Sequence, residues 1–373
     1  MEKMRIPIIA ASLIKFGDLW EKGIIDLIRD SSQKVLSDAG IKSNEVDELY
    51  IANEFSSIAT GQSSLSSIAF EETGISNSVC VNAGDVSGAA AIKMAANSIL
   101  AGQSDIVMVL GAEKITDLKI SEISSLASSL ISQKEEGFIG ATVQSQFAIM
   151  TRKYLHDFRL NSHELSFIPS INHKNAVENE FAQYQFELSE EKISSSPFIA
   201  EPIRLLEASS YCDGSAAIIM CSRKVSKKFS RKIKANLIAS SLVSDSLALS
   251  KRKSITAIES TAKASKEAFE AAGIKQKDVD LMEVHDFVPI TEVLAVEDMG
   301  FAGKGDGIKF IRSNAKKINL SGGLKGCGHP LGATGIRQSI DIVKKLKKLR
   351  LRYGITQTLT GTGSMSAVNI FSV

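Results

Sequence analysis

The chain has 373 residues, of which 44% are hydrophobic and 23% are charged, the balance of an ordinary globular protein with a large buried core. Lys and Arg number 44 against 42 Asp and Glu, a net charge of +2. This near-neutral balance excludes the strongly basic surface typical of nucleic-acid binding. No apolar run approaches the roughly 20 residues that span a bilayer, so we expect no membrane segment. The length is that of two or three domain-sized units.

The four cysteines lie far apart in the chain, at Cys80, Cys212, Cys221 and Cys327. None forms a C-x-x-C pair, so we expect neither a zinc ribbon nor a redox pair, and no resident metal. Scattered thiols in a large chain are typical of a reduced protein, and we therefore expect a cytoplasmic location.

Two decapeptides in the chain are related. Residues 38–47, DAGIKSNEVD, and residues 271–280, AAGIKQKDVD, match in register at Ala, Gly, Ile, Lys, Val and Asp. Each follows an amphipathic helical stretch and precedes a short apolar strand, so Gly40 and Gly273 stand where glycine ends helices. The repeated order predicts two related α/β halves, which we place at residues 1–230 and 231–373.

Each half also contains a glycine-rich turn that leads into a helix. The remaining predicted elements are a strand at 78–82, an Ala-rich helix at 84–102, a strand at 105–114, a glycine-rich turn at 321–335, a helix at 336–349, and two strands around a glycine turn at 355–373. The small side chains of the Ala-rich helix require another element to approach it closely. Strands that alternate with helices predict a mostly parallel sheet covered on both faces.

Residues 117–195 interrupt this pattern with the Ser-rich segment SEISSLASSLISQKEE and the polar segment NHKNAVENEFAQYQFE. We interpret them as a loop-and-helix domain inserted into the first half. Inserted loops of this kind often cover an active site.

Two of the five histidines stand at positions that favour a role in chemistry. His285, in EVHDFVPITE, follows a second-half strand, and His329 lies in the glycine-rich GCGHPLGATG. Strand ends in an open α/β sheet usually bind ligands, and two imidazoles at one edge can polarise a carbonyl or move a proton. The alternative for each is a hydrogen-bonded structural histidine. We expect His156 and His163 to be exposed. The sequence does not decide between the alternatives for His173.

The glycine-rich turn matches neither the dinucleotide nor the P-loop pattern. Its backbone N–H groups do suit an anion or oxyanion at a helix start. Asp85 stands just before the Ala-rich helix. Asp is among the best N-cap residues, at about 1 kcal/mol, and it favours the positive end of a helix. Local physics therefore predicts that Asp85 caps this helix.

Together these segments resemble the thiolase superfamily, most closely its branch of sterol-carrier-protein-type thiolases and archaeal acetyl-CoA acetyltransferases. The likeness runs nearly end to end, through IIAASLIKFGD, GAEKIT, SSPFIAEPIRLLEASSYCDGSAAIIM, VHDFVPITE, NLSGGLKGCGHPLGATG and GTGSMSAV. It implies an α/β fold of duplicated βαβαβαββ halves in a layered α-β-α-β-α arrangement with an inserted loop domain. It also implies action on the C–C bond of 3-oxoacyl-CoA, as in acetyl-CoA acetyltransferase.

In that family a cysteine at the start of the Ala-rich helix takes the acyl group and the Gly-His-Pro histidine activates it. A second cysteine is the acid/base, and the other histidine or an asparagine helps to form an oxyanion hole. The resemblance assigns these histidine roles to His329 and His285. It places Thr360 and Gly361, in the closing turn, at the oxyanion site.

This chain departs from the family at both cysteines. Asp85 stands at the nucleophile position, and Phe287 or Thr358 at the two positions where the acid/base cysteine occurs. An acyl-aspartate is a mixed anhydride that hydrolyses readily, which disfavours ordinary thiolysis. A carboxylate beside two histidines still serves as a general base. Cys327, two residues before His329, is a weaker candidate for a replacement thiol.

Three functions therefore remain open. The first is a thiolase-type acyltransferase with altered or reduced thiolysis. The second is a non-thiolytic retro-aldolase or decarboxylase acting on an acyl-CoA. The third is a catalytically silent subunit that binds CoA or serves as a scaffold.

The resemblance also implies CoA or acyl-CoA as substrate, with no permanently bound cofactor. It implies a homodimer or homotetramer that associates through edge strands of the first half. A small zinc-ribbon and OB-fold protein is an expected partner.

Overall fold

The computed structural model describes residues 4–373. Nine strands form one sheet in the order β3-β2-β4-β7-β1-β8-β11-β10-β9. Their bounds are β1 (Ile6–Leu13), β2 (Glu48–Ala52), β3 (Ser78–Val81), β4 (Ile106–Glu113), β7 (Gly214–Cys221), β8 (Ala235–Ser244), β9 (Leu281–Glu283), β10 (Tyr353–Thr360) and β11 (Met365–Ser372). A separate hairpin joins β5 (Phe198–Ala200) to β6 (Ile203–Arg204).

The sheet is mixed. Strand β2 pairs in parallel with β3 and β4, and β9 pairs in parallel with β10. The strands β4, β7, β1, β8, β11 and β10 are joined by antiparallel pairings. Parallel pairing therefore occurs at the two ends of the sheet, where helices connect the neighbouring strands. The five pairings from β4 to β10 are antiparallel, and of these the pairing of β1 with β8 joins the two predicted halves.

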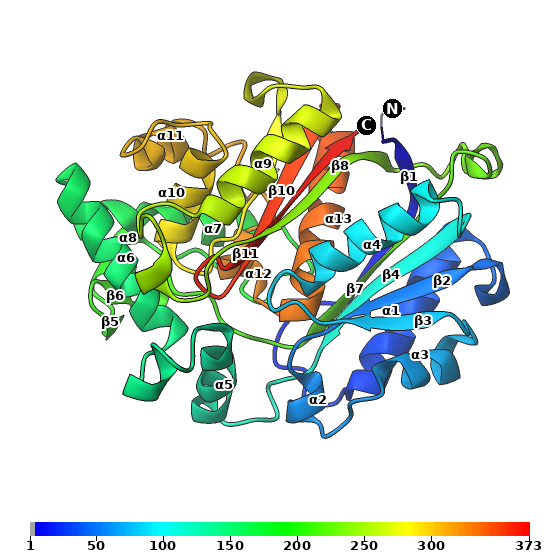
Figure 1. Cartoon of the computed structure of the whole chain (residues 1–373), viewed down its shortest axis with the longest axis horizontal. Coiled ribbons are helices and arrows are strands. Elements are labelled where there is room, and N and C mark those ends of the chain that lie inside the picture. The colour runs from blue at the N-terminus through cyan, green and yellow to red at the C-terminus, as the bar shows by residue number, and fades with distance from the viewer. Residues whose placement is uncertain (1–3) are drawn as a thin grey trace.

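Helices lie on both outer faces and through the centre (Figure 1). The main ones are α1 (Ile24–Ala39), α3 (Leu65–Thr73), α4 (Ser87–Leu100), α9 (Glu259–Ala272), α10 (Pro289–Asp298) and α13 (Leu331–Leu349). Helices α1 and α3 pack on the first half and α9 packs on β8 and β11, whereas α4 and α13 contact strands of both halves. This gives the predicted α-β-α-β-α layering. Helix α13 is buried on almost every side from Leu331 to Val343, as expected of a central helix.

The two central helices touch through glycine. A Cβ atom on Gly88 of α4 would lie 2.7 Å from the carbonyl oxygen of Gly332, and a Cβ on Gly335 of α13 would lie 2.7 Å from the backbone nitrogen of Ala89. Neither position has room for a side chain. The close approach predicted from the small residues of the Ala-rich helix is confirmed.

The repeated decapeptides adopt the same local structure. Gly40 ends α1 with φ 65° and Gly273 ends α9 with φ 67°, each in the left-handed conformation that glycine favours. A strand follows each turn, β2 in the first half and β9 in the second. The halves differ later, because the third strand of the second half is reduced to a single bridge between Met282 and Ile318.

Between β4 and β7 the chain forms a mainly helical body, in green in Figure 1. It contains α5 (Ile120–Ala127), α6 (Val143–Phe158), α7 (Phe167–Ala176) and α8 (Glu190–Ser194), while α2 (Ser56–Ala59), α11 (Gly307–Ser313) and α12 (Gly323–Cys327) complete the helices. Helix α6 packs on α10 of the second half. The boundaries placed at 117–195 and at 230/231 stay predictions. No helix within residues 4–373 is long and apolar enough to cross a membrane.

Candidate active site

Three segments from both halves bring their polar side chains together. Asp85 lies in the loop before α4, His285 lies two residues beyond β9, and His329 lies just before α13. One potential ligand atom from each lies within 4.8 Å of the other two, and the imidazole centroids are 5.2 Å apart. The three residues are 5%, 2% and 0% exposed. The structure therefore places the three residues singled out from the sequence in one buried cluster.

Asp85 is bonded across the cluster and not to its own helix. Its Oδ1 lies 2.7 Å from Nε2 of His329, and its Oδ2 accepts the N–H of Gly361 at 2.9 Å. Helix α4 begins at Ser87 with Val86 as N-cap and no side-chain cap. The prediction that Asp85 caps this helix is wrong. The carboxylate instead faces an imidazole that offers a charge-assisted bond, which is stronger than a bond to a neutral amide.

The other nitrogen of His329 is oriented by a hydroxyl. Thr334 Oγ1 lies 2.7 Å from Nδ1 of His329 and donates its own hydrogen to the carbonyl of Pro330 at 3.0 Å. Because a hydroxyl has one hydrogen, Thr334 must accept from Nδ1–H. Nε2 therefore faces Asp85, and the short contact between them holds one shared proton.

The surroundings of Asp85 favour its ionised form. Burial by itself raises the pKa of Asp85, but the hydrogen bond and charge of His329, the proximity of His285 and the amide of Gly361 together hold it below its ordinary value. The lowered pKa favours the carboxylate form of Asp85, whose Oδ1 lies 2.7 Å from Nε2 of His329.

His285 is neutral and only partly bonded. Burial, together with the nearby charge of His329, lowers the pKa of His285 to about 3. Its backbone N–H donates to Oε1 of Gln357 at 3.1 Å, but its buried ring Nδ1 has no hydrogen-bond partner among residues 4–373. Buried polar atoms are rarely left unpaired, and an exception points to function or to a missing ligand.

Comparison with known proteins identifies the family of this chain. The family model described as "Thiolase, N-terminal domain" matches residues 6–224, and the one described as "Thiolase C-terminal domain-like" matches residues 241–372. The chain belongs to the thiolase family. An acetyl-CoA acetyltransferase of Methanocaldococcus jannaschii is 36% identical, with 98% of each chain covered. The placement inferred from the motifs is confirmed.

More distant relatives share the fold. Sterol carrier protein 2 of Bos taurus is 26% identical over 92% of this chain and 66% of that protein. The solved structure of the Ltp2-ChsH2(DUF35) aldolase matches with a TM-score of 0.81 at 18% identity, covering 98% of this chain and 97% of the other. The thiolase fold predicted from the motifs is thus shown.

The two residues that the resemblance aligns with the thiolase acid/base cysteine, Phe287 and Thr358, have no thiol. Phe287 packs against the rings of both Tyr211 and His329, with centroids 5.3 and 5.9 Å away. Thr358 donates its hydroxyl to Gln338 at 2.7 Å.

The cysteines do not replace the missing thiols. Cys327 donates to the carbonyl of Ser321 at 3.2 Å, and burial raises the pKa of its thiol to about 12. Cys80 lies on β3, where burial raises the pKa of its thiol to about 11. Both raised values disfavour the thiolate that a nucleophile requires.

The closing turn contacts Asp85 directly. Thr360 Oγ1 accepts the backbone N–H of Asp85 at 3.1 Å, and the N–H of Gly361 is bonded to the carboxylate. Gly361 has φ 53°, and a Cβ there would lie 2.3 Å from the carbonyl oxygen of Leu130, so only glycine fits. The oxyanion role of these two residues stays a prediction.

Sequence reasoning missed three neighbours of the cluster. Thr334 orients His329, Tyr211 stacks on the His329 ring at 5.6 Å, and Glu54 accepts the N–H of Gly84 at 2.7 Å. Thr334 has a local signal, since it lies five residues after His329 in the same motif. Tyr211 and Glu54 have none, because distant segments bring them in. The exposure predicted for His156 and His163 is confirmed, and His173 is buried.

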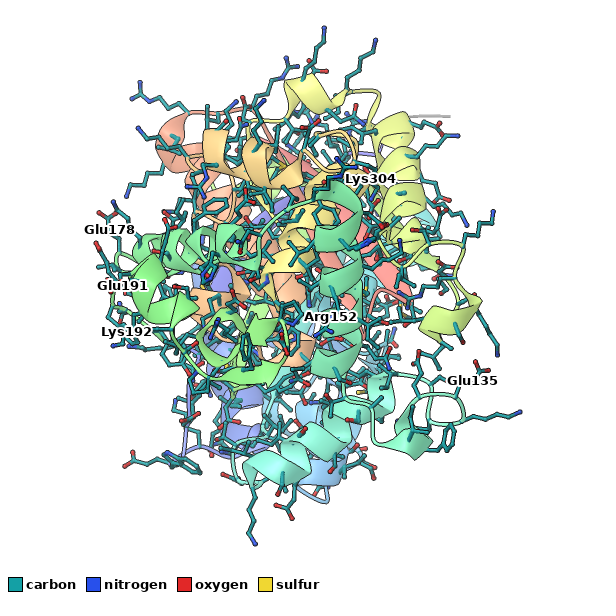
Figure 2. All side chains as sticks on the ribbon, turned by 90° about the vertical axis from the view of Figure 1, so that its left-hand side faces the viewer. Glu135, Arg152, Glu178, Glu191, Lys192 and Lys304 are labelled. Atoms are coloured by element: carbon teal, nitrogen blue, oxygen red, sulfur yellow. The ribbon has the colours of Figure 1, made fainter. Side chains whose placement is uncertain are left out.

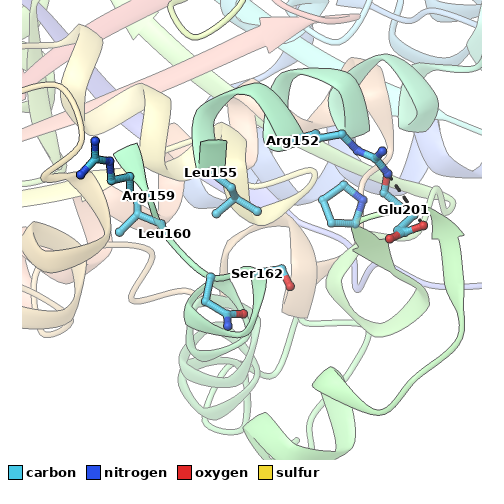
Figure 3. A pocket seen from close by; sticks show the side chains of 8 residues that line it. Arg152, Leu155, Arg159, Leu160, Ser162 and Glu201 are labelled. Carbon is cyan, nitrogen blue, oxygen red and sulfur yellow. Dashed lines mark hydrogen bonds and ion pairs between the residues drawn. The ribbon is translucent and has the colours of Figure 1, made fainter. Parts of the chain in front are cut away.

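Two surface hollows lie along α6, and neither includes a residue of the cluster. The first, of about 530 Å³, is lined by Arg152, Leu155, Arg159, Leu160, Asn161, Ser162, Glu201 and Pro202 (Figure 3). The second, of about 600 Å³, is lined by Ser145, Ala148, Ile149, Arg152, Lys153, His156, Ala200, Glu201 and Ile255. Figure 2 shows Arg152 on the face that carries α6. Cationic side chains therefore gather along this helix.

Proposed function

We propose that this thiolase-family protein cleaves or forms the C–C bond next to an acyl-CoA thioester by proton transfer, without an acyl-enzyme. The observation that carries this proposal is the 2.7 Å contact between Oδ1 of Asp85 and Nε2 of His329, at the residue that the sequence resemblance aligns with the thiolase nucleophile. Both carboxylate oxygens of Asp85 accept hydrogen bonds, which suits a base better than an acyl acceptor. An acetyl-CoA acetyltransferase among the relatives and an aldolase among the structural neighbours support an acyl-CoA substrate and C–C chemistry.

The geometry supports a retro-aldol reaction of a 3-hydroxyacyl-CoA. Asp85 takes the proton of the 3-hydroxyl, the bond between C2 and C3 breaks, and its electron pair forms the enolate of the shorter acyl-CoA. His329 gives its Nε2 proton to C2, so the products are a carbonyl compound and an acyl-CoA. A proton then returns from Asp85 to His329 across their 2.7 Å contact, which restores both groups. General acid–base catalysis of this kind contributes about 10²–10⁴-fold.

His285 is the group best suited to the enolate oxygen. A neutral imidazole carries one N–H, and the Nδ1 atom of His285 has no protein partner to satisfy it. Donors fixed where negative charge develops stabilise an enolate in a buried site far more than they would in water. We assign His285 this role, with the Thr360–Gly361 turn next to it.

The hollows along α6 are where we place the phosphates of CoA. Arg152 lines both, and Arg159 and Lys153 each line one. On its inner side α6 reaches the cluster through Phe147, whose ring lies 6.2 Å from Phe287, itself 5.9 Å from His329. One helix thus connects a cationic surface with the buried site.

We also propose that the protein works as a dimer with a small partner chain. Strand β3 ends the sheet, so one side of its backbone is unpaired, and Val79 on it is 44% exposed. An open edge strand is a ready site for pairing with another chain. The DUF35 partner named in the related aldolase supports the small protein.

The test uses 3-hydroxyacyl-CoA substrates without free CoA, with the acyl-CoA products separated by chromatography. We expect C–C cleavage that does not require CoA and that falls at least 100-fold in Asp85→Asn. The exposed Asp18 provides the matched control, Asp18→Asn, with unchanged turnover. CoA-dependent cleavage of acetoacetyl-CoA would instead identify a thiolase, and CoA binding without turnover would identify a silent subunit. Either result would overturn the proposal.

A further inference from the structure

Two segments of the chain are strongly basic. Residues 223–234, which join β7 to β8, contain seven Lys or Arg and no Asp or Glu, and residues 344–352, from the end of α13 to β10, contain six and none. These thirteen of the 44 Lys and Arg leave 31 for the rest of the chain, against all 42 Asp and Glu. The near-neutral total therefore conceals a local excess of positive charge, which the total alone does not exclude.

The two segments form one surface, which we call the basic face. Nζ of Lys347 donates to the carbonyl of Ile233 at 3.3 Å, so the end of α13 lies against the loop before β8. Eleven of the thirteen Lys and Arg residues are exposed, and only Lys234 and Lys345 are half-buried. Positive charges from two distant parts of the sequence are therefore gathered on one accessible surface.

Few carboxylates neutralise the basic face. Lys224 pairs with Asp105, and Lys234 pairs with Asp38. In the described part of the chain, no ion pair with a carboxylate is formed by Lys227, Lys228, Arg231, Lys232, Lys344, Lys345, Lys347, Lys348, Arg350 or Arg352. Such an excess is unfavourable in isolation because like charges repel one another, and a bound polyanion would remove that cost.

The end of α13 shows the excess most clearly. Lys344 lies three residues before Lys347 and four before Lys348 on this helix, and like charges at these spacings destabilise a helix. The negative end of the helix dipole favours cations in the last turn. That effect accounts for Lys347 and Lys348, but not for Lys344 or for the loop 223–234. The basic face therefore has more positive charge than the stability of α13 requires.

The basic face lies far from the buried cluster. Helix α13 begins just after His329 and ends in the basic face, and its 19 residues span about 28 Å. Strand β10 likewise starts next to Arg352 and ends at Thr360, whose hydroxyl is bonded to Asp85. A partner bound to the basic face therefore leaves the cluster unobstructed.

The side chains of the basic face favour an array of phosphates that is recognised by charge alone. Nine of its thirteen cations are lysines, which bind phosphate as point charges, without the bidentate fork of arginine. The rings beside it are not free to stack on bases, because Phe229 is 9% exposed and the guanidinium of Arg352 lies over Tyr353 at 4.7 Å. Leu349 is 48% exposed beside Lys348, and an apolar side chain among lysines suits the headgroup layer of a bilayer better than a nucleic acid.

We propose that the basic face binds the surface of membranes that contain anionic phospholipids and holds the protein there reversibly. Clusters of about four to eight Lys or Arg bind such surfaces by attraction to the lipid phosphates, and this face has more. A single exposed leucine is too little to insert stably, so the attraction is mainly electrostatic and depends on salt. The proposal uses no residue of the buried cluster, so it holds whichever reaction that cluster performs.

The experiment measures the sedimentation of full-length protein with vesicles of phosphatidylcholine, prepared with and without phosphatidylglycerol. We expect binding only to vesicles that contain the anionic lipid. This binding should be lost between about 0.1 M and about 1 M salt, where the screening length falls from about 10 Å to about 3 Å.

Variants of the basic face test which charges are responsible. We expect the affinity for anionic vesicles to fall roughly 100-fold or more when four lysines are replaced together, as Lys227→Gln, Lys228→Gln, Lys347→Gln and Lys348→Gln. Arginine at the same four positions keeps every charge and should preserve binding. The matched control removes the same net charge from the helical body between β4 and β7, as Lys119→Gln, Lys134→Gln, Lys174→Gln and Lys192→Gln at exposed residues, and should bind normally.

Three results would overturn the proposal: no binding to the anionic vesicles, equal binding to both kinds of vesicle, or equal loss of affinity in the two glutamine variants. Double-stranded RNA that bound more tightly than anionic vesicles at the same salt would overturn it too, because the partner would then be a nucleic acid. Leu349→Ser should weaken vesicle binding about 3-fold. The measurement needs no turnover, so its outcome is independent of the proposed function.

Discussion

Two buried aspartates in this fold differ in what surrounds them. Asp213 is 0% exposed and Asp85 is 5% exposed. The carboxylate of Asp213 accepts hydrogen bonds from the backbone of Leu19, Ile115 and Thr116, from the hydroxyl of Thr116 and from the ammonium of Lys114. That of Asp85 accepts one amide and one imidazole. Two aspartates of similar burial therefore have different sets of hydrogen-bond donors.

This difference distinguishes a carboxylate that stabilises the fold from one that can react. Fixed donors and an ammonium saturate Asp213, which leaves its oxygens no lone pair for a substrate, and it ties together the residues that follow β4. Asp85 has one titratable partner and stands near a ring nitrogen with no partner at all. The number of fixed donors on a buried carboxylate, more than its depth, indicates which group is free to react.

The largest effect we expect is loss of stability in Asp213→Ala. Lys114, whose side chain is 2% exposed, would keep only Asp117, which is 51% exposed, as its ionic partner. Breaking a buried pair in this way costs about 3–5 kcal/mol. Urea unfolding should show this loss, whereas Asp85→Asn should change the free energy of unfolding by about 1 kcal/mol or less. Equal losses in the two variants would refute the distinction.

The pH dependence of stability tests the connection between the surroundings of Asp213 and those of Asp85. Glu54 donates its backbone N–H to Glu113, beside Asp213, and accepts that of Gly84, beside Asp85. Burial raises the pKa of Glu54 to about 7. The folded state therefore holds its proton to a higher pH than the unfolded state, so the stability from Glu54 is present below about pH 4.5 and is lost as pH rises to about 7.

We expect the free energy of unfolding to fall by about 1–2 kcal/mol over this pH range, after allowing for the partial exposure of Glu54. In Glu54→Gln this decrease should be absent. The amide oxygen still accepts from Gly84, so the fold should not otherwise suffer. Urea unfolding between pH 4.5 and 7.5 makes the measurement. If the free energy of unfolding changed with pH equally in the wild type and in Glu54→Gln, Glu54 would not be the group responsible.

A smaller effect concerns the orientation of His329. Thr334→Val keeps the shape of the side chain but removes the hydroxyl that fixes Nδ1. We expect kcat for C–C cleavage to fall about 10-fold, or about 1.4 kcal/mol, with little change in KM. Thr73→Val removes a hydroxyl bonded in the same way to the carbonyl four residues earlier, but on α3, and should leave kcat unchanged. Equal effects on kcat would argue against an orienting role.

The smallest effect is expected at the surface. Arg152→Ala should raise KM for acyl-CoA about 3–10-fold and leave kcat unchanged, because an exposed charge contributes about 1 kcal/mol or less. Lys192→Ala, on the same face but outside the two hollows (Figure 2), should leave KM unchanged. Steady-state kinetics at low ionic strength distinguish the two. If Arg152→Ala and Lys192→Ala had identical KM values, the hollows along α6 would not be part of the acyl-CoA binding site.

The sequence predicted the features that depend on near neighbours or on a strict pattern. Gly40 and Gly273 were placed by the helices before them, and the contact through Gly88 by a run of small residues. His285 and His329 were placed at one sheet edge by the strand and the turn that carry them. Asp85 was misread because N-capping is a local contribution of about 1 kcal/mol, whereas its real partner is 244 residues away. The antiparallel pairing of the central strands likewise depends on contacts between distant segments, such as β1 with β7 and with β8.

The joining of the halves through β1 and β8 has a consequence for how the protein reaches its working form. Asp85 belongs to the first part of the chain, and both imidazoles belong to the second. The ribosome must release nearly the whole polypeptide before these three residues can meet. The site can therefore bind a substrate only near the end of synthesis and folding. The site is therefore complete only when both parts of the chain have folded together.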